Sequence, residues 1–183
     1  MGVLGATSAF PELAGAARET GMLEAAGRLV NGARAAGIDV VHCVAARRPD
    51  GKGSNHNARL FAVAAKAGGQ LTPGSEAVEV CPEIGMAPSD LVLTRLHGLG
   101  PMGGTDLDVV LRNLGARTVV GVGVSVNIGM TDFAFDAVNA GYQFVLPRDA
   151  VTGVPTAYAD AVIDNTLALV ATVTTVDAVL DCW

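Results

Sequence analysis

The spacing of apolar residues along the chain alternates between a helical period and short β-branched runs. Residues 21–37 predict a helix that ends at Gly37, because one helical face is apolar: Leu23, Ala26, Leu29, Val30 and Ala33. Residues 38–44 then predict a strand. A polar loop over residues 47–57 follows, and residues 58–67 resume helical spacing until Gly68 and Gly69.

The second half of the chain continues this alternation of strands and helices. Strands are predicted over residues 90–96, 117–124 and 142–146, and helices over residues 105–115, 130–140 and 157–172. Thr105 is a good helix N-cap residue. Strands that alternate with helices of this length predict parallel βαβ units. We therefore expect an α/β fold, a three-layer α/β/α sandwich with a mostly parallel, Rossmann-like sheet.

Composition narrows the class of protein. Half of the 183 residues are hydrophobic, which favours a single domain over residues 1–183. The net charge of −6 comes without a basic stripe, which argues against a nucleic acid partner. The longest apolar stretches, such as residues 118–126, fall short of the roughly 20 residues that span a bilayer. The N-terminus lacks a signal-peptide pattern, so we expect a cytoplasmic protein without a membrane partner.

The cysteines do not form a recognisable metal or redox motif. Cys43, Cys81 and Cys182 are far apart in the sequence, which excludes a CxxC pair and is typical of free thiols. No other metal-ligand spacing is present, so we expect no metal and no cofactor. Cys43 lies near a predicted strand end, where a thiol is either a reactive group or, more often, a small hydrophobic residue.

The turn over residues 125–129 is the leading candidate for a ligand site, because ligands of parallel sheets bind beyond the carboxyl ends of the strands. Val126 breaks the G-x-G-x-x-G pattern, so a dinucleotide fingerprint is absent. The segment approaches the nucleophile elbow G-x-S-x-G, but Asn127 stands where the last glycine should be. All three histidines precede Ser125, which disfavours a serine triad. The turn is either a closely packed connection or an oxyanion site built from backbone N–H groups.

Cationic side chains near this turn are further candidates for substrate binding. Arg95, at a predicted strand end, either holds a substrate carboxylate or is a surface cation. His97 lies in a glycine-rich loop over residues 97–104 and either faces the same cleft or is solvated. Arg47 offers the same alternatives in its loop. Asp106 and Asp108 are explained by the dipole of the helix that they begin.

Residues 118–142, TVVGVGVSVNIGMTDFAFDAVNAGY, resemble the isochorismatase-like hydrolases, a cysteine hydrolase family. Members carry a similar G-V-S-T-N-V-C-V turn, followed by a helix that ends D-A-x-x-x-G-Y. The resemblance extends over most of the chain after Gly21 and implies the same α/β fold. It implies hydrolysis of amides such as nicotinamide, or of the enol ether of isochorismate, by an aspartate, a lysine and a cysteine.

This chain departs from the family at each of those three positions. The cysteine position falls on Gly129, as in the isochorismatase branch, where no covalent step is needed. The lysine position falls near Arg95, whose guanidinium stays charged and cannot shuttle a proton. The family's first strand, with its aspartate, would precede Met1. We expect the natural reading frame to start upstream, unless the neighbouring strands close up or a partner subunit supplies the pairing.

The resemblance therefore favours a hydrolase-like protein that acts on or binds a small carboxylated or amide substrate without a cysteine nucleophile. Arg95 and Gly129 are the predicted catalytic positions, and Arg47, His97, Ser125 and Asn127 are the predicted substrate contacts. A catalytically inactive binding or oligomer-forming member of the same fold is the alternative. We also expect a homo-oligomer, with Leu180 and Trp183 as contact residues, although a terminal tryptophan also suits a core of its own chain.

Overall fold

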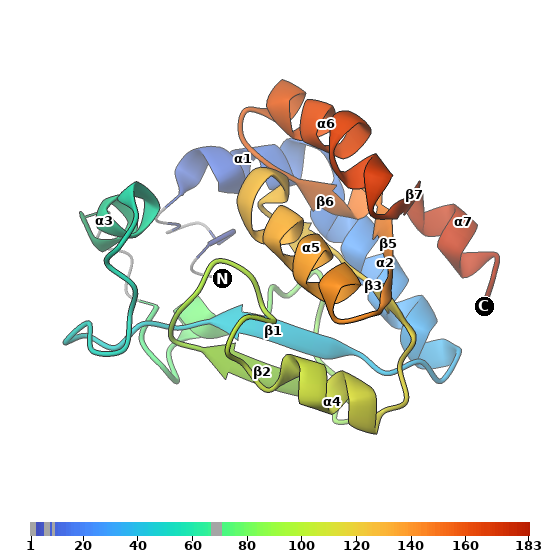
Figure 1. Ribbon diagram of the computed structural model, residues 1–183, viewed down its shortest axis with the longest axis horizontal. Helices are drawn as coiled ribbons and strands as arrows, with labels where there is room; N and C mark the ends of the chain where they lie inside the picture. The colour runs from blue at the N-terminus through green and yellow to red at the C-terminus, as the bar shows by residue number, and fades with distance from the viewer. Residues whose placement is uncertain (1–2, 6–7, 9, 67–70) are drawn as a thin grey trace.

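The computed structural model describes residues 3–5, 8, 10–66 and 71–183, which form an α/β fold (Figure 1). The helices are α1 (Pro11–Glu19), α2 (Met22–Ala35), α3 (Arg59–Lys66), α4 (Leu107–Asn113), α5 (Thr131–Asn139), α6 (Thr156–Asn165) and α7 (Val176–Leu180). The strands are β1 (Val41–Ala45), β2 (Leu91–Arg95), β3 (Thr118–Val120), β4 (Gly123–Val124), β5 (Gln143–Pro147), β6 (Val151–Thr152) and β7 (Thr172–Thr174). Short helical turns are η1 (Glu76–Val78), η2 (Val126–Met130), η3 (Arg148–Ala150) and η4 (Leu167–Leu169).

The strands pair in parallel, as predicted, but in three groups rather than in one sheet. These groups are β1 with β2, then β3 with β5 and β7, and β4 with β6. The strand predicted over residues 117–124 is divided, because the ladder of β3 ends at Val120 and β4 starts at Gly123. Gly121 still donates its N–H to the carbonyl of Val145, at 3.0 Å. Its missing side chain leaves room for the ring of Phe144.

Alternate residues of the central strands enter two hydrophobic cores, one on each face. Val119, Phe144 and Leu146 join the core that contains α4, α5 and α6. Val120 and Val145 pack instead against the core formed by α2, η3 and α7. This alternation is what a buried parallel sheet requires, and it gives the three predicted layers.

The chain after residue 156 differs from its prediction. The helix predicted over residues 157–172 ends at Asn165, and η4 follows. Thr172, Val173 and Thr174 form β7, which pairs with β5. These β-branched residues gain a strand partner that a local helical pattern cannot reveal. No helix or strand was predicted where α1, β6 and α7 lie.

The first half of the chain matches its prediction more closely. The first predicted strand starts at Val41 rather than at residue 38. Later in the chain, Thr105 accepts a hydrogen bond from the N–H of Leu107 at 3.2 Å, but the residue at the N-cap position of α4 is Asp106 rather than the predicted Thr105. The predicted end of α3 at Ala67, Gly68 and Gly69 lies outside the described residues.

A buried ion cluster fastens α2 to the amino ends of β1 and β2. The Asp90 carboxylate, with a side chain 1% exposed, lies 2.6 Å from Nη2 of Arg34 and 2.9 Å from Nε2 of His42. It also accepts the N–H of Ala87 at 2.9 Å. The bond from Arg34 is the main reason why the pKa of Asp90 lies well below its usual range. Asp90 is therefore ionised and holds one end of the β1–β2 pair in place.

The C-terminal residues pack against α2 of the same chain. Leu180 occupies the space that a side chain at Gly32 would need, and Trp183 lies close by while remaining 40% exposed. No helix in the described ranges is long and apolar enough to cross a membrane.

Candidate functional site

The predicted ligand turn connects β4 to α5. The chain leaves β4 in an extended conformation at Ser125 and enters η2, which continues directly into α5. The carbonyl of Ser125 accepts hydrogen bonds from the N–H groups of Ile128, at 3.2 Å, and Met130, at 3.0 Å. The Val124–Ser125 peptide bond is cis. Residues 125–129 therefore lie at the N-terminal end of a helical segment, where backbone N–H groups favour anions.

Gly129 lies in close contact with the glycine-rich loop over residues 97–104. A Cβ atom added at Gly129 would lie 3.3 Å from the carbonyl oxygen of Leu99 and 3.6 Å from that of Val124. The first distance is shorter than ordinary van der Waals contact. Because Gly129 has no side chain, the Leu99 carbonyl can lie directly against the turn.

Arg95 reaches the same loop from the carboxyl end of β2. Its Nη1 donates to the carbonyls of His97, at 3.1 Å, and Gly98, at 3.0 Å, and its Nη2 donates to that of Leu99, at 3.2 Å. The Leu99 carbonyl therefore contacts both Arg95 and Gly129. The structure brings the two predicted catalytic positions together through this shared backbone atom.

The remaining donor of Arg95 is unusual. Its Nε is buried and has no hydrogen-bond partner in the part of the chain that the structure describes. Burial lowers the pKa of Arg95, but a guanidinium stays charged at any physiological pH. Asp132, in the first turn of α5, acts on Arg95 through its charge and lies against Gly100. A buried N–H without a partner costs stability, so the site offers a donor that a ligand oxygen could satisfy.

Two cavities meet at the turn. A cavity of about 600 Å³ is lined by Arg95, Leu99 and Gly129, together with Cys43 of β1. A second, of about 420 Å³, is lined by Ser125 and Asn127. Leu99, Val124 and Gly129 line both cavities. Gly129 is therefore accessible to a small molecule from either cavity.

Asn127 connects the turn to the loop after β6 by a hydrogen bond. Its Nδ2 donates to the carbonyl of Val154 at 3.4 Å. Its Oδ1 is buried without a partner among the described residues, and a Cβ at Gly153 would lie 2.7 Å from it. Asn127 therefore has both a structural contact and an acceptor that a ligand could use.

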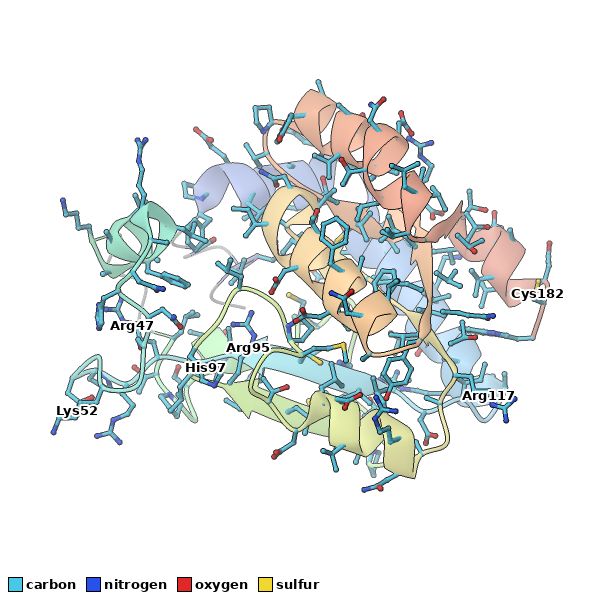
Figure 2. All side chains as sticks on the ribbon, in the orientation of Figure 1. Arg47, Lys52, Arg95, His97, Arg117 and Cys182 are labelled. Atoms are coloured by element: carbon cyan, nitrogen blue, oxygen red, sulfur yellow. The ribbon has the colours of Figure 1, made fainter. Side chains whose placement is uncertain are left out.

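His97 and Arg47 line neither of these cavities. The His97 side chain is exposed, and its Cε1 lies 3.1 Å from where a Cβ at Gly104 would be. Arg47 follows β1, and its backbone N–H donates to the carbonyl of Leu71 at 2.6 Å. Figure 2 shows Arg95 and His97 close together, with Arg47 nearer to α3. The substrate roles of His97 and Arg47 stay predictions.

Cys43 and Cys81 both line the larger cavity, and Cys43 is the one whose thiol interacts electrostatically with Arg95. Its side chain faces the larger cavity from β1. Burial raises the pKa of the Cys43 thiol to about 11, although the charge of Arg95 acts in the opposite direction. The thiolate, which is the nucleophilic form, is therefore scarce at neutral pH.

Sequence reasoning missed two parts of the site. The Leu99 carbonyl is a backbone atom, and no residue type signals its role. In the sequence, Asp132 is explained by the dipole of the helix that it begins. Only the structure, in which it lies against the loop over residues 97–104, relates its charge to Arg95. As to metals, no group of three His, Cys, Asp or Glu side chains within the described ranges is placed to hold one.

Comparison with known proteins gives the family. Residues 10–178 match the isochorismatase domain family. An uncharacterized isochorismatase family protein, YwoC of Bacillus subtilis (strain 168), is 36% identical over 85 residues. That match covers 46% of this chain and 44% of YwoC, so it spans less than half of that relative's length.

Solved structures with the same fold support this assignment. An isochorismatase family protein from Desulfovibrio vulgaris superposes with a TM-score of 0.78 at 25% identity, over 88% of this chain and 84% of that one. N-carbamoylsarcosine amidase from Thermoplasma acidophilum superposes with a TM-score of 0.70 at 26% identity, over 85% of this chain and 83% of that one. The parallel α/β architecture is therefore that of isochorismatase-like proteins.

Proposed function

This chain belongs to the isochorismatase family, and we propose that it binds and hydrolyses a small carboxylated or amide substrate without a cysteine nucleophile. The observation that carries the proposal is the buried Nε–H of Arg95, which has no partner in the described part of the chain and belongs to a side chain that lines a cavity beside Gly129. A substrate carboxylate or carbonyl oxygen would satisfy this donor. The likeness to N-carbamoylsarcosine amidase supports an amide or carboxylate as the substrate class.

In the proposed mechanism, the backbone and Arg95 act on the substrate electrostatically. N–H groups of the turn near Gly129 polarise a substrate oxygen, and Arg95 anchors its negative charge. Gly129 provides no thiolate, so for an amide substrate a water molecule adds directly to the polarised carbonyl carbon. The bond from that carbon to the amide nitrogen then breaks, one water proton passes to the leaving amine, and the carboxylic acid keeps the water oxygen. Ser125 and Asn127 would contact the part of the substrate that extends into the smaller cavity. His97 and Arg47 would contribute by orienting an anionic substrate at the entrance.

A second candidate function is ligand binding without turnover. The specific observation in its favour is that Arg95 already donates three hydrogen bonds to the loop over residues 97–99. A residue in that position holds the loop even when no chemistry occurs. The absence of a nucleophile at Gly129 is consistent with this alternative. Self-association, which we also propose, is compatible with either function, and light scattering that shows only a monomer would refute it.

A substrate panel separates the two functions. Nicotinamide and other amides, isochorismate and simple esters are tested for turnover, with and without a thiol alkylating agent. Turnover that survives alkylation supports the proposal, and turnover that alkylation abolishes would restore Cys43 as the nucleophile. Binding that is detected calorimetrically without turnover supports the second candidate.

Two variants test the assigned groups. Arg95→Met should abolish binding of the best panel compound, whereas Arg117→Met, at an exposed position far from the turn in Figure 2, should not. Gly129→Pro removes an N–H of the turn and should abolish turnover. Full activity in the proline variant would contradict the role of the turn.

A further inference from the structure

The carboxylate of Asp132 lies beside the loop that Arg95 contacts. A Cβ atom added at Gly100 would lie 2.5 Å from Oδ2 of Asp132. The residue before Gly100 is Leu99, whose carbonyl accepts a hydrogen bond from Arg95 at 3.2 Å. The negative charge of Asp132 acts on the Arg95 guanidinium, and a cation that is partly removed from water needs such a countercharge. Asp132 therefore offsets part of the positive charge that Arg95 presents to a ligand.

A second carboxylate on α5 adds to the negative potential of this region. Asp136, one helical turn after Asp132, lies against the same glycine-rich loop, with Oδ2 3.6 Å from where a Cβ at Gly103 would be. Burial and the charge of Asp132 both raise the pKa of Asp136, as expected for like charges on successive turns of a helix. An anion that approaches Arg95 is therefore repelled by Asp132 and, more weakly, by Asp136.

The free hydrogen-bonding capacity of Arg95 also suits a single oxygen atom. A guanidinium holds a carboxylate best through two parallel N–H groups. Nη1 of Arg95 already donates to two carbonyls and Nη2 donates to a third, so the end-on pair of Nη1 and Nη2 is in use. The buried donor without a partner in the described chain is Nε. One free N–H matches the one oxygen of an uncharged carbonyl group.

A second unpartnered group near the turn is an acceptor. Oδ1 of Asn127 is buried and has no partner among the described residues. Asn127 lines the smaller cavity, which shares Leu99, Val124 and Gly129 with the larger one. An amide has an N–H that can be donated to this oxygen, whereas a carboxylate has none. Between them, Arg95 and Asn127 offer what an amide can use in full and a carboxylate cannot.

We propose that Asp132 is a specificity-determining residue of this site: its carboxylate offsets the charge of Arg95, so that the site takes an uncharged amide in preference to the corresponding carboxylate. This inference rests on the proposed function and narrows its substrate class for the group that lies at the turn. A charged group elsewhere on the substrate, near Arg47 and His97, is compatible with it. Hydrolysis converts the neutral amide into a carboxylate, so the charge of Asp132 also favours release of the product.

Matched pairs of amides and acids test this role. The Nε–H of Arg95 is followed by NMR in protein that contains isotopically labelled arginine, and Arg95→Met identifies its signal. Nicotinamide and nicotinate, and then acetamide and acetate, are titrated at neutral pH into the wild type, Asp132→Asn and Asp181→Asn. Asparagine keeps the shape of the Asp132 side chain against Gly100 and removes only the charge. Asp181 is an exposed control at the end of α7, and its neighbour Cys182 lies far from Arg95 (Figure 2).

The wild type should bind each amide more tightly than the matching acid. Asp132→Asn should raise the affinity for the acid relative to the amide by at least about fivefold. Asp181→Asn removes the same charge at a distance, where salt screens it, and should change this ratio by less than about twofold. If Asp132→Asn does not fold, Asp136→Asn should shift the ratio in the same direction.

Two results would overturn the inference and leave the proposed function intact. One is an Asp132→Asn protein that loses affinity for both members of a pair equally, which would show a purely structural role. The other is a wild type that binds the acids more tightly than the amides. If no compound of either pair moves the Nε–H signal of Arg95 in any of these proteins, the proposed function itself is refuted, and the inference falls with it.

Discussion

Replacing Arg95 with methionine tests whether this residue is mainly a structural clamp or a ligand-binding group. Methionine keeps most of the apolar stem and removes all three bonds to the carbonyls of residues 97–99. A hydrogen bond from a charged group contributes about 1.5–3 kcal/mol to stability when it is protected from water. Of the three bonds, only the one to Gly98 is partly buried, and those to His97 and Leu99 are exposed. The gross loss is therefore about 2–3 kcal/mol.

A second effect acts in the opposite direction. The buried Nε–H of Arg95 has no partner in the described chain, and its removal relieves a penalty of about 1 kcal/mol or more. We therefore expect Arg95→Met to lower the free energy of unfolding by about 1–2 kcal/mol, measured by urea denaturation. Arg117→Met, at an exposed position, should change it by less than about 0.5 kcal/mol.

A bound substrate should widen this difference, because only the wild-type protein offers the Nε–H to a ligand oxygen. At a ligand concentration of 100 Kd, the wild type should gain about 2.7 kcal/mol, and the methionine variant should gain nothing measurable. A methionine variant that unfolds at the same urea concentration as Arg117→Met and is stabilised equally by the ligand would refute both parts of this reasoning.

Three further variants address the scaffold. Gly27→Ala should destabilise the protein by more than about 1 kcal/mol, because the new Cβ overlaps the Glu83 carbonyl. Gly15→Ala, with open space around it, should instead stabilise the protein by about 0.5–1 kcal/mol. Thermal melts in which both variants shift stability in the same direction would contradict this. Asp90→Asn should cost about 3–5 kcal/mol at pH 7 in denaturant titrations. Because the folded-state pKa of Asp90 is depressed, its contribution is complete above the unfolded value of about 3.9 and is lost as the pH falls below it, so the difference between wild type and variant should shrink below pH 4.

Amphipathic helices and β-branched strands were the features that the sequence predicted well. The apolar face of α2 and the glycine that follows it set that helix locally, and the runs in β1, β2 and β5 are short and unambiguous. Where the chain was predicted wrongly, a distant partner decides the structure. Thr172–Thr174 becomes β7 because β5 lies beside it, and no local period contains that information.

The site was predictable in its position but not in its contacts. The turn over residues 125–129 follows a buried strand, which places it at the ligand edge of a parallel sheet by topology alone. The relation between Arg95 and Gly129 depends on the Leu99 carbonyl, which belongs to a loop that Arg95 itself contacts through three hydrogen bonds. The role of such a side chain cannot be predicted from residue spacing, because its backbone partners come close to it only after the chain has folded.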